Sequence, residues 1–570
     1  MIRIVTKNGV SLDLSPDTEF EISIENPMLE DSHIPVPFST AISFQPSPTN
    51  NEAFDYIDAM MLEPVVKSLE ATIYSGGMPL ISGALIYDGV DDGKLNYTFS
   101  SKSVEEQLDI YIHEVKGLTN ATGSVKGTGK AFDLIEQSRE GGRALDFGTP
   151  MIVCKQRVLK NEVPMEMNAP YEQEIEPKVK YRNWVGAKNS PVAPAVRIKS
   201  ILAPCLSIVR VDDTIERLFD SLAVIAFYAP EGTWGGFRKE TAAIVRLDIA
   251  DMLPECKANE LLVNTLKVLC ASLYRDGDSG YVMLSNSGIL QSREFLNWDD
   301  KISDIYSLSD QDAKQYIFGY QDYDNGNSFN PDKEIEIEGY IGMKDLISHR
   351  YIDDNDYVYL RDDMTKDVFS QDPKRQLADI IDQYTGETES TAADSSFDAK
   401  TDFRLVKCVP VWARWMPANG GFGSEYRICP RVEFPAMDNT RPKNIYIGTL
   451  VHNQLTDKGQ IPYGTKLYHD EEEDIFNEED YPESDPNWNT GLSIIPGDLL
   501  NGIHKDFAEW IGQEHMVVSA DLNLSDEDIA NFRIWKKVLI RHRPFIVKKL
   551  TLTLSAASDH IACRGEFISQ

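Results

Sequence analysis

The residues that come nearest to a catalytic motif are Gly277-Asp278-Ser279-Gly280. They match part of the Gly-Asp-Ser-Gly-Gly sequence around a serine-protease nucleophile, but Tyr281 stands where that sequence has its last glycine. Such a protease also needs a histidine base and an orienting carboxylate within reach of the serine. His113 lies upstream without the surroundings of such a base. We therefore interpret 276–280 as a hairpin turn.

Metal-binding and phosphate-binding patterns are also incomplete. Asp322–Asn327 begins like a calcium loop, but position twelve is Lys333 instead of a bidentate glutamate. The nine histidines form no His-Glu-x-x-His pattern, and His469, beside two acids, suggests only adventitious metal binding. Gly123–Lys130 has the wrong glycine spacing for a phosphate loop, and Ala131 replaces the required Ser or Thr. We expect no enzyme, no cofactor and no metal site.

Composition indicates a large folded protein with a strong negative charge. The 570 residues are 42% apolar and 10% aromatic, and the formal net charge is −35. A chain of this length exceeds one core, so we expect roughly three to five domains. So acidic a chain should repel nucleic acid unless its basic residues are segregated. The acidity is compatible with lining a channel through which DNA slides, and equally with ordinary solubility.

The cysteines and the N-terminus bear on the compartment. The seven cysteines are scattered, without a C-x-x-C pair, which favours reduced and mostly buried thiols. Residues 1–7 lead straight into a strand and an Asn8-Gly9 turn, without the apolar core of a signal peptide. No apolar run approaches the length that spans a bilayer. We expect a soluble protein that does not follow the usual secretory route.

The N-terminal stretch reads as antiparallel strands. Glu19–Glu25 alternates acidic and apolar residues, as in a strand with one buried face, and a turn follows at Asn26-Pro27. Ile34–Phe44 contains two prolines, which favour an edge strand or an extended arm because proline cannot donate to a central ladder. Glycine-rich turns then separate three strands, at Lys67–Tyr74, Leu80–Tyr87 and Lys94–Ser100.

The middle of the chain alternates helices and strands. Asp212-Asp213 should cap a helix whose apolar face carries Ile215, Leu218, Phe219 and Leu222. We expect a strand at Val224–Tyr228 and a second helix at Asn259–Leu273. Strands at Tyr281–Leu284 and Ile289-Leu290 should follow, and then the segment from Phe295 to Ile302.

The last part reads as mainly β. We expect a short helix at Ala131–Glu140, further strands within 303–370, a mobile loop at Glu387–Asp398 and a solvated acidic loop at Asp470–Asp485. Ser525 should cap a short helix. The strands that we expect toward the C-terminus are Phe403–Trp415, Tyr426–Phe434, Asn444–Val451, Lys537–Ile540, Pro544–Leu554 and Ile561–Ile568.

In its order of features the chain resembles the baseplate hub proteins of phage tails, especially those of tailed phages that infect Bacteroidetes. The resemblance rests on the run from Phe20 through Asn26-Pro27 to Pro46–Asn51, on the hairpin Gly77–Gly83, and on the middle helices and strands up to Trp298-Asp299. It implies an α+β, mainly β fold, with N- and C-terminal β-barrel-like tube domains and a middle α/β portion.

The resemblance also implies a role. It predicts a structural virion protein that forms a ring, most often a homotrimer, at the tail tip after assembly in the host bacterial cytoplasm. The ring would join the tail tube to tip or spike proteins, and the phage genome would pass through its lumen without specific binding. The predicted division of the chain is 1–115 (tube-type β), 116–205 (insertion with arms), 206–300 (α/β), 301–400 (β-rich with the loop), 401–510 (β with the acidic loop) and 511–570 (tube-type β).

The candidate interface has two parts. Arg533–Lys549 carries seven Lys or Arg and no acid, which fits a subunit interface, a contact with nucleic acid or protein inside a tube, or side chains that only cover apolar surface. The proline-rich arm could reach a neighbour. The candidate residues are Ile34, Pro35, Pro37, Arg533, Lys536, Lys537, Arg541, Arg543, Lys548 and Lys549.

Three other functions remain open. A hexameric distal tail protein would start the tail tube and carry receptor-binding proteins. An adhesin-like β protein could stack sugars on Trp412–Trp415, although these tryptophans also suit a core. A cell-wall hydrolase fused to a hub is disfavoured because the sequence has no catalytic constellation.

Overall fold

The structure is a computed structural model of the chain. It describes residues 2–35, 39–55, 68–75, 77–91, 93–100, 104–116, 122–126, 146–148, 152–154, 165–167, 194–226, 233–234, 237–241, 244–276, 280–321, 388–389, 395–405, 407–415, 425–434, 441–450, 494, 496–557 and 561–570. Within these residues the fold is α+β and mainly β, which confirms the predicted class.

The N-terminal unit is an antiparallel sheet, as the glycine-rich turns predict. Its described strands lie in the order β2 (Ser11–Leu12), β1 (Arg3–Thr6), β5 (Ser68–Ser75), β6 (Met78–Asp91), β7 (Lys94–Ser100) and β4 (Ser39–Phe44). β4, which follows the prolines, is at the edge of this order. The buried rings of Phe44, Phe54 and Tyr97 pack together beneath the sheet, next to α1 (Pro48–Ala53).

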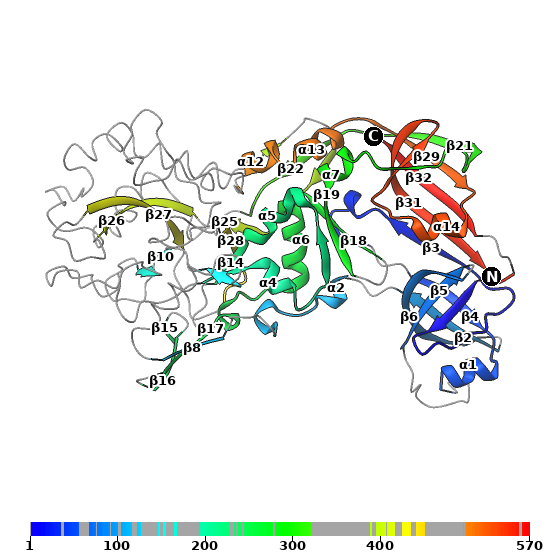
Figure 1. Ribbon diagram of the computed structural model, residues 1–570, viewed down its shortest axis with the longest axis horizontal. Coiled ribbons are helices and arrows are strands. Elements are labelled where there is room, and N and C mark those ends of the chain that lie inside the picture. The colour runs from blue at the N-terminus through cyan, green and yellow to red at the C-terminus, as the bar shows by residue number, and fades with distance from the viewer. Residues whose placement is uncertain are drawn as a thin grey trace.

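The C-terminal unit is a second, curled sheet that takes in one N-terminal strand. Its described strands run β20 (Phe295–Asn297), β30 (Lys537–Ile540), β31 (Arg543–Ser555), β32 (Ala562–Ser569), β29 (His515–Leu522) and β21 (Ile302–Gln311). β3 (Glu19–Glu25) pairs antiparallel with β31 over its full length, from Glu19 opposite Ser555 to Glu25 opposite Lys549. The two terminal units therefore lie side by side at one end of the molecule (Figure 1).

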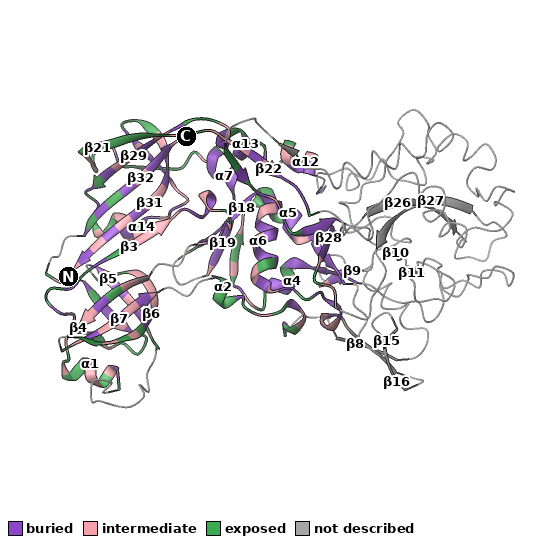
Figure 2. Ribbon diagram, turned by 180° about the vertical axis from the view of Figure 1, so that it is seen from behind, coloured by how far each residue is buried: buried purple, intermediate pink, exposed green. Residues whose placement is uncertain are grey.

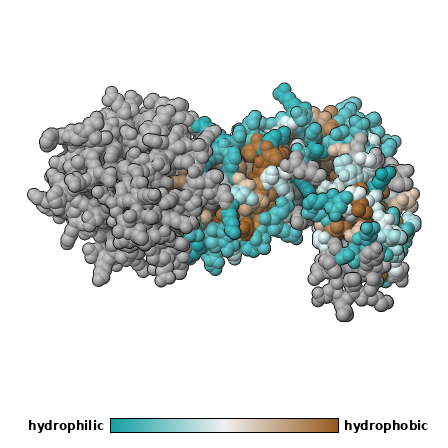
Figure 3. Space-filling view, turned by 60° about the horizontal axis from the view of Figure 1, so that its bottom comes forward, coloured by the Kyte–Doolittle hydropathy of each residue, from teal (hydrophilic) through white to brown (hydrophobic). Residues whose placement is uncertain are grey.

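The middle unit places helices against a small sheet. Its sheet has the described order β13 (Ile208–Val211), β19 (Tyr281–Ser285) and β18 (Ala271–Arg275). The long helix α6 (Ala258–Leu269) buries its leucines, and α4 (Ile198–Leu202), α5 (Asp213–Ser221) and α7 (Asn286–Gln291) lie around it (Figure 1). Figure 2 shows the buried residues concentrated here and along the inner strands of the terminal sheets, and Figure 3 shows apolar surface gathered on this unit.

Smaller elements complete the described chain. They are helices α2 (Val104–Gln107), α12 (Pro496–Asn501), α13 (Lys505–Ile511) and α14 (Asp526–Asn531), the 3-10 turns η1 (Pro27–Leu29), η2 (Ile112–Glu114) and η4 (Ala250–Met252), and strands β8 (Thr122–Lys126), β9 (Phe147–Gly148), β10 (Ile152–Cys154), β11 (Met165–Met167), β12 (Ala195–Arg197), β14 (Leu222–Ile225), β15 (Thr233–Trp234), β16 (Phe237–Thr241), β17 (Ile244–Asp248), β22 (Lys314–Phe318), β23 (Thr388–Glu389), β24 (Ser395–Asp398), β25 (Phe403–Leu405), β26 (Lys407–Trp415), β27 (Glu425–Phe434) and β28 (Ile445–Thr449). No described helix has both the length and the apolar character of a membrane span.

Several local predictions are confirmed. Asp212 caps α5 through its side chain, and Ile215, Leu218 and Phe219 are buried on one face of that helix. Ser525 caps α14 in a capping box with Asp528. The three strands expected near the C-terminus are present as β30, β31 and β32. β18 and β19 form the antiparallel pair that flanks the predicted turn, whose residues 277–279 lie outside the described chain.

Other local predictions are wrong. Leu273 lies in β18, because α6 ends at Leu269 and Cys270 adopts a left-handed conformation with φ +46°. Ile289 and Leu290 belong to the helix α7, whose cap is the Ser285 side chain. Ser395–Asp398, expected within a mobile loop, is the strand β24, paired in parallel with β22. Leu222 opens β14 instead of completing the helical face, and the expected strand at Val224 therefore starts two residues early.

Further predictions fall on residues that the structure does not describe. They are the helix at Ala131–Glu140, the strands expected within 322–370, the calcium-like segment Asp322–Asn327, Gly127–Lys130 of the glycine-rich segment, His469, and the acidic stretch Asp470–Asp485.

Gly83 offers a test of the N-terminal sheet. A Cβ added at this position would lie 2.6 Å from the Ser100 carbonyl oxygen of β7 and 3.0 Å from the Phe99 ring. Because a backbone atom cannot move aside without breaking the ladder, we expect Gly83→Ala to lower the free energy of unfolding by about 1–3 kcal/mol. Gly497→Ala is the matched control, since nothing lies within 4 Å of its Cβ. Equal urea midpoints for the two variants would contradict this account.

Candidate functional site

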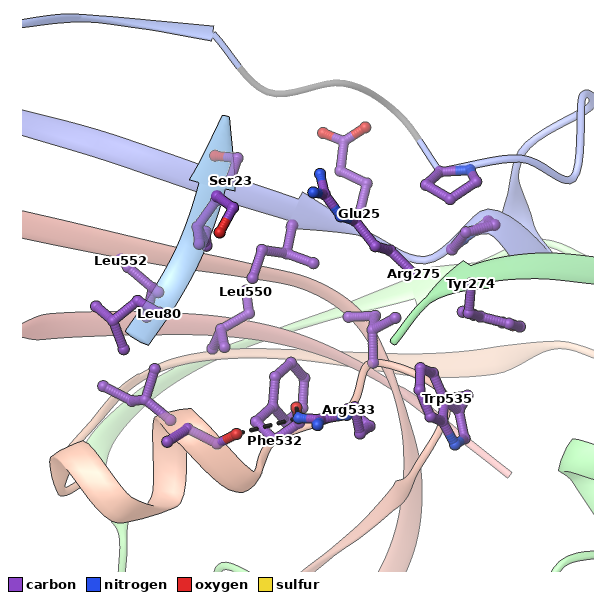
Figure 4. Close-up of a pocket in the computed structure, with 18 of the residues that line it drawn as sticks. Ser23, Glu25, Leu80, Tyr274, Arg275, Phe532, Arg533, Trp535, Leu550 and Leu552 are labelled. Atoms are coloured by element: carbon purple, nitrogen blue, oxygen red, sulfur yellow. Dashed lines mark hydrogen bonds between the residues drawn. The ribbon is translucent and has the colours of Figure 1, made fainter. Parts of the chain in front are cut away.

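A cleft of about 420 Å³ lies where the two terminal units meet the middle unit. It is bordered by β3, the β6 hairpin, the end of β18, the segment that follows α14, and β31. In Figure 4, Glu25 and Arg275 lie on one side of the cleft, Phe532 and Arg533 lie on the other, and Leu550 stands between them. The cleft thus brings together segments that are hundreds of residues apart in sequence.

Asn26, at the end of β3, connects the walls of this cleft. Its side chain is buried, and its Nδ2 donates to the Val547 carbonyl oxygen at 2.8 Å and to the Ile534 carbonyl oxygen at 3.4 Å. Its Oδ1 accepts from the Tyr274 hydroxyl at 3.1 Å and from the Met28 amide at 3.2 Å. One amide therefore links the N-terminal strand to the C-terminal sheet and to the middle unit.

Arg533 and Trp535 attach the segment after α14 to β18. The Arg533 Nε donates to the Asp276 carboxylate at 2.9 Å, and its Nη1 donates to the carbonyl oxygens of Ala530 and Phe532 (Figure 4). The Trp535 ring packs edge-on against Tyr274 with centroids 5.3 Å apart. The Arg533–Asp276 pair is half-buried, so its geometry fixes the orientation of the two segments more than it adds to stability.

The residues that line the cleft mainly make contacts between the three units. Neither a histidine nor a cysteine is among its lining residues. The Ser23 hydroxyl faces Thr551 Oγ1 at 3.3 Å, and Ser82 faces Thr72 Oγ1 at 2.9 Å, so each hydroxyl is engaged across its own sheet. The carboxylate of Glu25, two residues from Ser23 on the same strand, accepts from the Lys549 ammonium. The lining side chains hold three units in a fixed relation.

A buried polar cluster lies in the middle unit, away from the cleft. His33, which adopts a left-handed backbone with φ +54°, donates from Nδ1 to Ser272 Oγ at 3.3 Å, and Ser272 donates to Asn286 Oδ1 at 2.7 Å. His504 Nε2 donates to the Val268 carbonyl oxygen at 2.9 Å, and its Nδ1 accepts from the Tyr316 hydroxyl at 2.8 Å. Both histidines have neutral partners and are fully buried.

Burial shifts every titrating group in this cluster toward its neutral form. It lowers the pKa of His33 to about 3, aided by the charge of Lys267, and lowers the pKa of His504 to about 4. It raises the pKa of the nearby Cys270 thiol to about 12 and that of Tyr316 well above its usual value. A buried thiol that stays protonated is a poor nucleophile, so the cysteine, tyrosine and histidine here form a structural network.

The structure separates the predicted basic residues by environment. Arg541 and Arg543 are exposed, and Lys536 is half-buried. The Lys548 ammonium lies 3.5 Å from Glu566, and the Lys549 ammonium donates to Glu25 at 2.9 Å within the same chain. Arg533 borders the cleft. Exposed members of the segment remain candidates for a subunit interface.

Lys537 and Ile34, both predicted at the interface, are buried within the described chain. Lys537 is only 2% exposed, and its ammonium donates to the Leu290 carbonyl oxygen at 2.7 Å and to Gln570 Oε1 at 3.0 Å, over the Phe295 ring. Ile34 is 4% exposed and belongs to the core, so this end of the arm packs within its own chain. Pro35 borders the cleft, whereas Pro37 lies outside the described residues. Burial leaves the side chains of Lys537 and Ile34 little surface to present to a neighbour.

Sequence reasoning missed the polar residues that connect the units. Asn26 was expected only as part of a turn, and neither His33 nor His504 belongs to a recognisable spacing. The Asn-Pro pair was the one available signal, because asparagine commonly bonds nearby backbone at turns. The distant partners of these side chains leave no trace in the local sequence.

Known proteins give a loose comparison. The sequence matches no protein-family model and no curated protein. Among solved structures, the 43 kDa tail protein of prophage MuSo2 from Shewanella oneidensis aligns over 100% of this chain and 98% of its own, at 6% identity and a TM-score of 0.33. The tail protein from Neisseria meningitidis MC58 aligns over 100% and 96%, at 7% identity and a TM-score of 0.34. At these TM-scores neither similarity assigns a fold or a role to this chain.

Asn26 can be tested by substitution. Asn26→Ala would remove an acceptor of the Tyr274 hydroxyl and a donor to the Val547 carbonyl oxygen in a buried place, and we expect a loss of about 2–4 kcal/mol in stability. Tyr274→Phe removes a single hydroxyl and should cost about 1 kcal/mol. Asn26→Asp should be worse than either, because it sets a carboxylate against two carbonyl oxygens. Chemical denaturation of the three variants gives the ranking. If Asn26→Ala has the same free energy of unfolding as the wild type, Asn26 does not hold the units together.

The buried histidines predict a pH dependence. Their folded-state pKa values lie below the unfolded value, so the unfolded chain binds more protons between about pH 6.5 and pH 4. The contribution of the neutral histidines to the free energy of unfolding should be fully present above about pH 6.5. It should be lost on acidification, by about 1 kcal/mol per pH unit for each histidine. Thermal unfolding from pH 8 to pH 4 measures the slope. His504→Gln should flatten the slope.

Proposed function

We propose that this protein is a structural component of a phage tail, the baseplate hub that joins the tail tube to the tail tip around the DNA channel. It would act by assembly and not by catalysis. It would assemble in the host bacterial cytoplasm and reside in the virion at the tail tip. Its partners would be further copies of itself, most simply as a trimer, with tube proteins above and tip or spike proteins below.

The pairing of β3 with β31 carries the proposal. The resemblance in sequence order implies N- and C-terminal β units that act together beside a middle α/β unit, and this strand pair joins the two terminal sheets through seven opposed residues. Asn26, which follows β3, and Arg533, which follows α14, then attach the C-terminal sheet to the end of β18 in the middle unit. A subunit with two joined β units at one end suits a ring that must keep its shape while neighbours bind above and below.

The net charge of −35 also supports the proposal. A ring that surrounds DNA must let a polyanion slide without adhering, and an acidic wall repels it. The alternative of a distal tail protein differs in symmetry, with six copies around the tube. For the carbohydrate-binding alternative, Trp412 and Trp415 lie in β26, and their side chains are outside what the structure describes.

The number of copies in the ring tests the proposal. We expect the purified protein to show a native mass of three chains and class averages with three-fold symmetry and an open centre in electron microscopy. A six-fold ring would favour the distal tail protein. A monomer at every concentration, together with binding to bacterial glycans, would overturn the hub proposal in favour of the adhesin.

A further inference from the structure

Among the strands whose burial the structure describes, β21 has the longest run of exposed residues. All seven residues from Asp304 to Asp310 are exposed, and Ile305 and Leu308 are 84% and 56% exposed. Large apolar side chains are normally scattered singly on a surface, and here two lie on one strand with the 40% exposed Tyr306. Figure 2 shows this strand largely in green at the rim of the C-terminal sheet.

One edge of β21 has no described partner strand. Its other edge pairs with β29 from Tyr306 opposite Ala520 to Gln311 opposite His515, and the register is irregular between Ile302 and Tyr306. β21 is also the last strand in the order of the sheet. A long edge with apolar side chains is a ready template for pairing with another chain, which monomeric proteins avoid.

The apolar inner face of the sheet continues onto β21. Leu308 lies opposite Val518, and Val518 lies opposite Phe567, so the three side chains form one row across the sheet. Val518 is 5% exposed and Phe567 is fully buried. Within the described chain, Val518 and Phe567 are therefore covered by other residues, whereas Leu308, at the end of the same row, is exposed.

The charges near this edge suit a partner surface that carries a basic residue. Residues 302–312 contain Asp304, Asp310 and Asp312 and no basic residue. Arg543 is exposed at the start of β31. β31 pairs with β30, and β30 pairs with the three-residue strand β20, which is the edge strand on this side of the sheet. Arg541 already stacks on Tyr306 of its own chain, with its guanidinium 4.5 Å from the ring, whereas Arg543, and Arg293 just before β20, are exposed on this side of the sheet.

We propose that β21 is a self-association edge, on which a second copy of this chain adds its β20–β31 side, with Arg543 of that copy facing Asp310. The contact joins two different edges of one sheet, and such head-to-tail contacts generate rings when the rotation closes. The second copy would extend the sheet, cover Leu308 and neutralise the acidic edge. The inference rests on the proposed hub function and names the surface that would build its ring.

The test measures self-association of full-length variants by sedimentation velocity across a concentration series. We expect Leu308→Asp to weaken association at least tenfold, while Val209→Asp, a similarly exposed residue on the edge strand β13, leaves it unchanged. Both side chains are exposed, so thermal unfolding should show that each variant folds normally.

A charge exchange makes the test specific. Asp310→Arg and Arg543→Asp should each weaken association, and the double variant should recover most of it, because each contact would again join opposite charges. Equal association of wild type, Leu308→Asp and Asp310→Arg would overturn the inference while leaving a ring, and the hub proposal, intact. Association through β21 into an open filament or a dimer would support the inference and contradict the hub. A strictly monomeric wild type would overturn this self-association.

Discussion

The need to satisfy one buried amide determines how the units of this protein are joined. Asn26 has two donors and an acceptor in a place that water does not reach, and an unpaired buried polar group is costly. The partners that satisfy it come from the turn after β3, the C-terminal sheet and the middle unit. All three must be in place for the four hydrogen bonds to form together, so the amide stabilises this arrangement of the units.

Local patterns predicted the elements that depend on local physics. The meander from Ser68 to Ser100 followed from glycine turns and alternation, and α5 followed from its Asp212 cap and apolar face. The predictions failed where tertiary context overrode the pattern. Leu273 continues the helical spacing of α6, but the left-handed Cys270 ends the helix, and the leucine turns into a buried strand.

The candidate site was less predictable because burial cannot be read from charge. Lys537 and Arg543 look alike in a basic run, yet one ammonium is enclosed between a backbone carbonyl and an aromatic ring, and the other side chain faces solvent. The exposure of Ile305 and Leu308 was equally hidden, since alternating apolar residues suggest a covered strand. The burial or exposure of each of these side chains depends on which strands pair with each other, and the pairing strand often lies far away in the sequence.

The β3–β31 ladder has a consequence for synthesis. Ser23 and Thr551, whose hydroxyls meet across this ladder, are separated by 528 residues. At roughly 5–20 residues per second, a ribosome needs about half a minute to two minutes to travel from one to the other. Throughout that interval an apolar strand carrying Phe20 and Ile22 has been made and its partner has not. The nascent N-terminal region must therefore wait in an incomplete state, which makes translation speed and chaperone supply determinants of the yield of this fold.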